Sequence, residues 1–92
     1  MIRRIRHRGL RRLYEDDDRR GLDAQHVEKI ARVLARLATA TEPRHLDLPG
    51  WRLHPLKGAL AGFWSVAISA NWRIVFRFEN SDVTDVDYLD YH

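Results

Sequence analysis

The sequence predicts an α+β fold in which two N-terminal helices pack on a small antiparallel sheet. Apolar residues recur at helical spacing in the first half of the chain and at every second position after Pro49-Gly50. The length of 92 residues suits a single domain, 1–92, that buries roughly 60–70% of its unfolded surface. The chain contains no cysteine, so we expect side-chain packing alone to stabilise it, without disulfides or thiolate zinc sites.

The N-terminal segment predicts a short strand followed by a helix. Residues 2–7 favour an edge strand, and Leu10, Leu13 and Tyr14 lie three and four positions apart, as on one face of a helix. The acidic run at 15–18 and the Arg-Arg-Gly that follows indicate a solvated turn.

A longer helix is the clearest element of the sequence. Asp23 is a suitable N-cap, and an apolar stripe then continues to about Ala40. The stripe consists of Val27, Ile30, Ala31, Leu34, Leu37 and Ala38. We expect this helix to pack that face against a sheet.

Four short strands are predicted at 51–53, 63–69, 72–79 and 83–89, with a hairpin turn at 80–82. Trp64, Val66 and Ile68 share one face, and Val86 and Tyr88 are expected to point inward. In the third strand, apolar and largely polar residues alternate, which separates a core face from a basic face. The alternating sets are Trp72, Ile74, Phe76 and Phe78 against Arg73, Val75, Arg77 and Glu79.

Charge is distributed unevenly along the chain. Residues 1–77 contain all 16 Lys and Arg with 8 acids, whereas residues 78–92 contain five acids and no Lys or Arg. A basic body favours a polyanionic partner such as a nucleic acid backbone, although a solvated surface explains the same excess. The sequence has no apolar run long enough for a membrane span and no signal-peptide pattern, so we expect a cytoplasmic protein without membrane contact.

Two segments carry the residues best suited to catalysis. One is Leu53-His54-Pro55-Leu56-Lys57-Gly58, and the other is Asp90-Tyr91-His92 directly after the last predicted strand. If they meet near Arg73 on the basic face, the set can cleave a phosphodiester without metal or cofactor. A base deprotonates the 2′-hydroxyl of a ribose, cations stabilise the charge on the phosphoryl oxygens, and an acid protonates the departing 5′-oxygen.

These motifs resemble the HigB toxins, a branch of the RelE/ParE toxin superfamily. The resemblance spans nearly the whole chain and rests on the order and spacing of several short motifs. They are His54-Pro55-Leu56-Lys57-Gly58, Phe63-Trp64-Ser65, Asn71-Trp72-Arg73-Ile74 and Asp90-Tyr91-His92, with Met1-Ile2, His7, Gly9-Leu10 and Thr39-Ala40-Thr41-Glu42 in support.

The resemblance implies a RelE-like (microbial RNase-like) fold and a ribosome-dependent endoribonuclease that cuts mRNA in the decoding site. It also implies a HigA-like helix-turn-helix antitoxin and a complex of the two proteins that binds operator DNA and represses its own operon. The implied catalytic residues are His54, Lys57, Arg73, Asp90, Tyr91 and His92.

Roles for these residues follow from their chemistry. His54 and His92 are the expected proton-transfer groups, in either order, while Lys57 and Arg73 stabilise developing charge. Tyr91 can stack on a base or donate a proton, and Asp90 can orient an imidazole or the lysine.

Two further residues are candidates for substrate binding. Asn71 can read an adenine edge or, equally, cap the turn between strands. Arg77 lies four positions from Arg73 on the same strand face, so the pair can contact successive phosphates.

Other interpretations remain open at this point. The chain can be a ParE-like inhibitor of DNA gyrase without catalytic activity, or a basic nucleic-acid-binding module. His92→Ala separates these classes, because a nuclease loses activity whereas a simple binder keeps its affinity. No metal site is expected, since Lys57 would repel a cation beside His54. We expect His7, His26 and His45 to be surface residues without a role.

Overall fold

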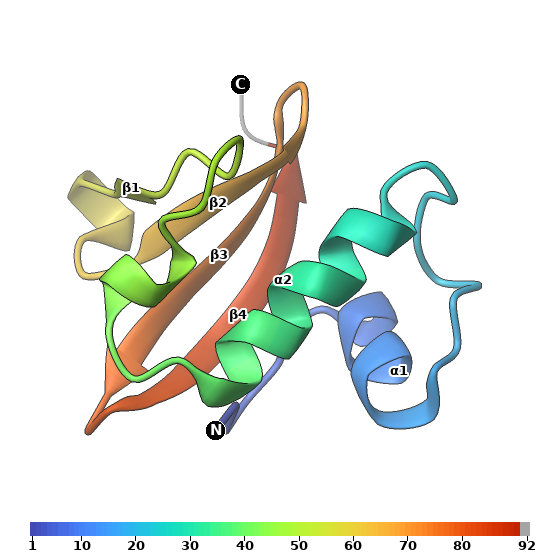
Figure 1. Cartoon of the computed structure of the whole chain (residues 1–92), viewed down its shortest axis with the longest axis horizontal. Helices are drawn as coiled ribbons and strands as arrows, with labels where there is room; N and C mark the ends of the chain where they lie inside the picture. The colour runs from blue at the N-terminus through green and yellow to red at the C-terminus, as the bar shows by residue number, and fades with distance from the viewer. Residues whose placement is uncertain (91–92) are drawn as a thin grey trace.

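Helices cover one face of a four-stranded antiparallel sheet in this computed structural model, which describes residues 1–90 (Figure 1). Strands follow one another in the sheet in the order β1-β2-β3-β4. The elements are α1 (Arg8–Asp16), α2 (Val27–Thr39), the 3-10 helices η1 (Pro43–Leu46) and η2 (Gly58–Leu60), and the strands β1 (His54–Pro55), β2 (Trp64–Ser69), β3 (Trp72–Glu79) and β4 (Asp82–Asp90). None of the helices within residues 1–90 has the length and apolar character needed to cross a membrane.

The core lies between α2 and the sheet, and α1 packs beside α2 (Figure 1). The predicted apolar stripe supplies Ile30, Leu34 and Leu37, each at most 2% exposed. From the sheet, the predicted inward residues Val66 and Val86 are fully buried. The alternation in β3 is confirmed, because Ile74 and Phe76 are buried in this core while Trp72 and Phe78 pack at its margin.

The β3–β4 hairpin turns at the predicted place, but its loop has two residues, Asn80 and Ser81, instead of the predicted three at 80–82. Asn80 and Ser81 both have positive φ, 52° and 71°, as a type I′ turn requires. Asp82 already pairs with Glu79 as part of β4, one residue before the predicted start of the strand. The pairing register shifts between Val75 and Arg77, opposite Asp85, whose φ is 53°. This irregularity turns Asp85 toward the N-terminal segment.

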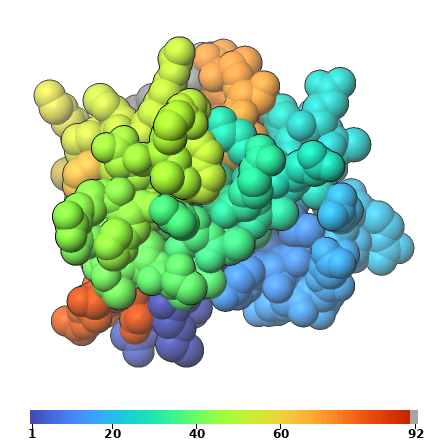
Figure 2. All heavy atoms as spheres, viewed as in Figure 1, coloured from blue at the N-terminus to red at the C-terminus, as the bar shows by residue number. Residues whose placement is uncertain are grey.

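The predicted edge strand at residues 2–7 is only partly confirmed. Ile2 forms an isolated parallel bridge with Val83, and Ile5 forms another with Val86. The two bridges are not joined into a continuous ladder of backbone hydrogen bonds. The Arg3 amide donates to the Val83 carbonyl at 2.8 Å, and the Arg6 amide donates to the Val86 carbonyl at 2.7 Å. Figure 2 shows the first residues of the chain, in dark blue, beside the β3–β4 turn, in red. The N-terminal segment thus covers the free edge of β4.

The start of the long helix differs from the prediction. The Asp23 carboxylate accepts from the Gln25 amide at 2.9 Å and therefore stabilises a turn that precedes the helix. The helix begins at Val27, with His26 as its N-cap residue. His26 is 7% exposed, so its predicted surface position is wrong.

Trp51–Leu53 is not a strand, contrary to the prediction. Arg52 has a φ of 51°, which interrupts the extended conformation that pairing requires. Trp51 instead lies buried against the core, and its carbonyl accepts one hydrogen bond from the Ala67 amide at 2.7 Å. The first strand follows immediately, at His54–Pro55.

Tyr14 also departs from the predicted helix face. Leu10 and Leu13 are buried as expected, but Tyr14 is 42% exposed. The face of α1 that packs on the core is therefore narrower than the sequence spacing indicates.

Candidate active site

A cleft of about 330 Å³ lies on the face of the sheet that the helices leave uncovered. It is lined by His54, Pro55, Leu56, Lys57, Ser65 and Arg73. Strand pairing explains how these residues meet: His54 lies opposite Ser65, and Ser65 lies opposite Val75. Partners directly across a sheet share a face, and Arg73 is two residues from Val75 on the same strand. The structure therefore brings together three of the predicted catalytic residues, His54, Lys57 and Arg73.

The cations of the cleft are available for an anionic ligand. His54 and Lys57 are exposed, while Arg73 is half-buried between β2 and β4. Within residues 1–90, no ion pair joins Lys57 or Arg73 to a carboxylate. Two cations without a carboxylate partner in the described part of the chain, together with an imidazole around one hollow, suit a phosphate group.

An apolar layer lies beneath these polar groups. Leu56 and Val75 are 9% and 2% exposed, yet neither belongs to the core between the helices and the sheet. Val75 pairs with Ser65 across the sheet, and Leu56 and Ser65 both line the cleft. A floor of this kind lowers the local dielectric, so charges at the cleft interact more strongly than they would in water.

Ser65 is a cleft residue that the sequence reasoning missed. Its side-chain oxygen is buried, and no hydrogen-bond partner is found for it among residues 1–90. The alternation of side chains along the strand could have identified it. Trp64 and Val66 face the core, so the residue between them must face the opposite side of the sheet. A hydroxyl without a partner beside His54 is a candidate donor to a bound substrate.

Arg77 and Asn71 do not line the cleft. The Arg77 guanidinium donates to the Asp85 carboxylate at 2.7 Å and to the Glu79 carboxylate at 3.1 Å. These contacts raise the pKa of Arg77 and tie its charge to the β3–β4 hairpin. Asn71 is exposed in the turn between β2 and β3.

The C-terminal triad is described only at Asp90. Asp90 is exposed at the end of β4 and pairs with Trp72, next to the pair of Arg73 with Leu89. The predicted site residues Tyr91 and His92 lie outside the described residues. Within residues 1–90, no group of three or more His, Asp or Glu side chains is arranged to hold a metal ion.

A buried aromatic cluster holds the strand that leads to Asp90. Tyr88 stacks on Trp72 with ring centroids 4.7 Å apart, and its hydroxyl contacts His26 Nδ1. Burial, together with the nearby Asp23 and Asp90, raises the pKa of Tyr88 to about 12, so the phenol is neutral. The His7 ring packs edge-on against the Tyr88 ring, and His7 Nδ1 accepts a hydrogen bond from the Leu10 amide at the start of α1. These histidines are structural residues that fix the helices to the end of β4.

Comparisons with known proteins show the family of the chain. The family described as "RelE-like toxin of type II toxin-antitoxin system HigB" matches residues 3–92. Endoribonuclease HigB from Proteus vulgaris is 44% identical over 92 residues, which cover 100% of both chains. A solved structure, the YoeB/ParE toxin from Agrobacterium tumefaciens, is similar with a TM-score of 0.51 and 32% identity over 79% of this chain and 81% of that chain. The predicted RelE-like fold is thereby confirmed, and the chain belongs to the family of HigB-like toxins of type II toxin-antitoxin systems.

Proposed function

We propose that this toxin is an endoribonuclease and that its cleft cuts mRNA on the ribosome during translation. The observation that carries the proposal is the convergence of His54, Lys57, Arg73 and Ser65 on one hollow. The full-length similarity to a protein named endoribonuclease supports the same activity.

The reaction we propose is an internal transfer at phosphorus. A base removes the proton of a ribose 2′-hydroxyl, the 2′-oxygen attacks the adjacent phosphorus, and the bond from phosphorus to the 5′-oxygen breaks. An acid gives its proton to the departing 5′-oxygen. The products are a 2′,3′-cyclic phosphate and a 5′-hydroxyl, so atoms and charge balance without a metal or cofactor.

The described residues fit distinct parts of this reaction. His54 supplies one of the two proton transfers, since an imidazole titrates near neutral pH. Lys57 and Arg73 stabilise the negative charge that gathers on the phosphoryl oxygens. His92 is our candidate for the other proton transfer, with Asp90 and Tyr91 as its supporting residues.

The size of the cleft supports the proposed dependence on the ribosome. A hollow of about 330 Å³ holds little more than one nucleotide and fixes the rest of a strand weakly. A ribosome would present the mRNA already extended and oriented, and orientation alone contributes a large part of many rate enhancements. We further propose a HigA-like antitoxin as partner, operator DNA as the target of the complex, and a cytoplasmic location.

The proposal is tested by mapping 5′ ends of a reporter mRNA in an actively translating extract. Wild-type protein should produce cuts phased with codons, and blocking translation should abolish them. His54→Ala and His92→Ala should each lower cutting at least about 100-fold, the scale of a general acid or base. Arg44→Ala is the control, because Arg44 is an exposed residue that pairs with Glu42 away from the cleft. Intact mRNA despite arrested growth would instead favour a gyrase inhibitor of the ParE type.

A further inference from the structure

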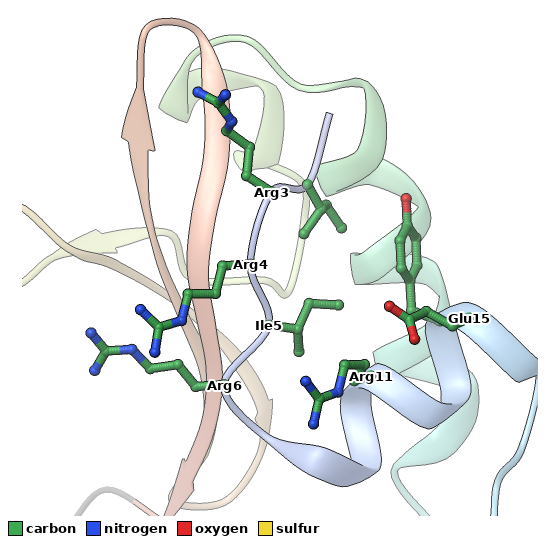
Figure 3. A pocket seen from close by; sticks show the side chains of 8 residues that line it. Arg3, Arg4, Ile5, Arg6, Arg11 and Glu15 are labelled. Atoms are coloured by element: carbon green, nitrogen blue, oxygen red, sulfur yellow. The ribbon is translucent and has the colours of Figure 1, made fainter.

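Among the basic hollows outside the cleft, two differ in how their charges are compensated. The larger, of about 520 Å³, lies between the N-terminal segment and α1. Three of its four arginines are paired with carboxylates: Arg3 lies 3.9 Å from that of Asp82, and Arg4 and Arg6 lie 3.8 Å and 3.3 Å from that of Asp85. Figure 3 shows Arg3, Arg4 and Arg6 extending over the strand, away from Glu15 on α1. These cations hold the N-terminal segment to the sheet and leave little charge for a ligand.

The second hollow is basic without such compensation. It has a volume of about 310 Å³, and its lining includes Lys29, Arg52 and Arg73 but no carboxylate. No ion pair within residues 1–90 involves any of these three cations. Arg73 also lines the cleft with His54 and Lys57, so the two hollows meet at its side chain.

The fold holds these cations together against their mutual repulsion. Lys29 is half-buried on α2, and its ammonium donates to the Gly50 carbonyl at 3.2 Å. Burial and the nearby Arg32 and Arg52 lower the pKa of Lys29, which means that its charged form is disfavoured in the free protein. An anion in the hollow would offset the repulsion between Lys29 and Arg52.

Backbone strain at Arg52 gives a second, independent indication. Its φ of 51° places a long L-residue in the left-handed region, where glycine or asparagine is usual. The neighbouring Trp51 carbonyl is bonded to the Ala67 amide at 2.7 Å, which fixes the segment beside β2. A strained cationic residue next to a cleft is the kind of feature that persists where function requires it.

We infer that Lys29, Arg52 and Arg73 form a second phosphate-binding site, which holds the backbone of single-stranded RNA one nucleotide beyond the cleft. The inference rests on the proposed function, since it takes the cleft to be the place of cleavage. Arg73 contacts the strand at the junction of both hollows, and Lys29 and Arg52 extend the contact along the backbone. The site recognises phosphate and therefore carries no base specificity.

The test is an NMR titration with 2′-O-methyl oligonucleotides of one to four nucleotides, which the enzyme cannot cleave because the nucleophilic hydroxyl is blocked. NMR detects binding even at millimolar affinity. For the wild type we expect amide shifts near His54 with the shortest probe, and additional shifts at Arg52, Ala67 and Ser69 when the probe is longer. Affinity should rise about tenfold with this extension.

Lys29→Ala/Arg52→Ala should abolish the gain from the longer probe while retaining the shifts near His54. The salt dependence of its affinity should weaken, with the slope smaller by roughly 0.7 for each phosphate that the variant no longer binds. Arg19→Ala/Arg44→Ala removes the same charge at other exposed positions and should retain the gain.

The outcomes separate the inference from the proposed function. If shifts stay confined to the cleft for every probe, or if the Lys29→Ala/Arg52→Ala variant gains affinity as the wild type does, the second site is wrong. His54-dependent cutting of mRNA would still stand in that case. If the longer probe binds as expected but His54→Ala cuts mRNA normally, the phosphate site stands and the assignment of the cleft as catalytic fails.

Discussion

Ser65 contains a buried hydroxyl without a hydrogen-bond partner among residues 1–90. Such a group lowers the free energy of unfolding by about 1–3 kcal/mol, because it has lost its hydrogen bonds to water and has formed none within the protein. Ser65→Ala should therefore leave the free energy of unfolding unchanged or raise it by about 1 kcal/mol. Since the residue lines the cleft, the same change should lower mRNA cutting about tenfold, the effect of one hydrogen bond to the transition state. Urea unfolding and end mapping measure the two effects separately.

Thr84→Val is the matched control for Ser65→Ala. It removes the hydroxyl of a buried residue in β4, outside the lining of the cleft, and should not change cutting. A Ser65→Ala protein that is less stable but fully active would show that the hydroxyl serves the fold and has no part in the reaction.

At the residue level, the sequence predicted much of the cleft but not its boundaries. His54, Lys57 and Arg73 were predicted because their residue types and motifs are informative without coordinates. Arg77 has the same type and face as Arg73, and the sequence could not indicate that Asp85 and Glu79 would engage it. That pairing depends on the register shift in β3–β4, which is a tertiary feature.

Asp85 connects two elements that are far apart in the sequence. It is 5% exposed and pairs with Arg77 from β3 and with Arg4 and Arg6 from the N-terminal segment. Asp85→Asn retains a residue type that tolerates the φ of 53° while removing the charge. We expect this change to lower the free energy of unfolding, because it removes the charged partner of the three arginines. The loss should be only about 1–2 kcal/mol, because Arg4 and Arg6 are solvent-exposed and their charges are screened.

The pH dependence of stability tests the same contact. The hydrogen bond from Arg77 is the main cause that holds the pKa of Asp85 below its ordinary value of 3.8. A carboxylate whose pKa is lowered by folding stabilises the protein at pH values above the pKa that it has in the unfolded chain. This contribution is lost as the pH falls through the pKa that the carboxylate has in the folded protein. The stability difference between wild type and Asp85→Asn should thus be full above about pH 4 and shrink below it. A difference that stays constant to pH 2 would contradict the ion pair.

The contact between α1 and the following loop depends on the absence of a side chain at Gly9. A Cβ at this position would lie 2.5 Å from the Gly21 carbonyl oxygen, so the backbone would have to move. We expect Gly9→Ala to lower the melting temperature, with an overpacking cost of about 1–3 kcal/mol that exceeds the gain in helix propensity. A melting temperature equal to or above that of the wild type would show that the backbone at Gly21 can move away from Gly9 without loss of stability.

Elements with a strong period were predicted well. The apolar stripe of α2 and the alternation in β2 and β3 each reflect a face buried in the core, so the pattern and the structure have the same cause. The segment at 51–53 was predicted wrongly as a strand because a positive φ at Arg52 leaves no trace in the residue type. The N-terminal segment forms only isolated bridges for a related reason, since its contacts depend on the position of β4.

Across the whole molecule, the uneven charge of the sequence has a structural explanation. Acids of the C-terminal part, Asp82 and Asp85, pair with arginines of the N-terminal segment along the edge of β4. The cations left without a carboxylate partner around the cleft, among residues 1–90, are Lys57 and Arg73, with Lys29 and Arg52 beside them. These four cations give the cleft and its margin a positive charge that suits a nucleic acid strand.

The most direct test of the cleavage mechanism is the chemistry of the cut ends. Ribosomes are programmed with a short mRNA that carries either ribose or a single 2′-deoxyribose at the mapped cut site, and the products are analysed by mass spectrometry. The account predicts a 2′,3′-cyclic phosphate and a 5′-hydroxyl from the ribose substrate and no cut at the 2′-deoxy position. Products with 5′-phosphate ends, or normal cutting at the 2′-deoxy position, would contradict attack by the 2′-hydroxyl in the cleft of His54, Lys57 and Arg73.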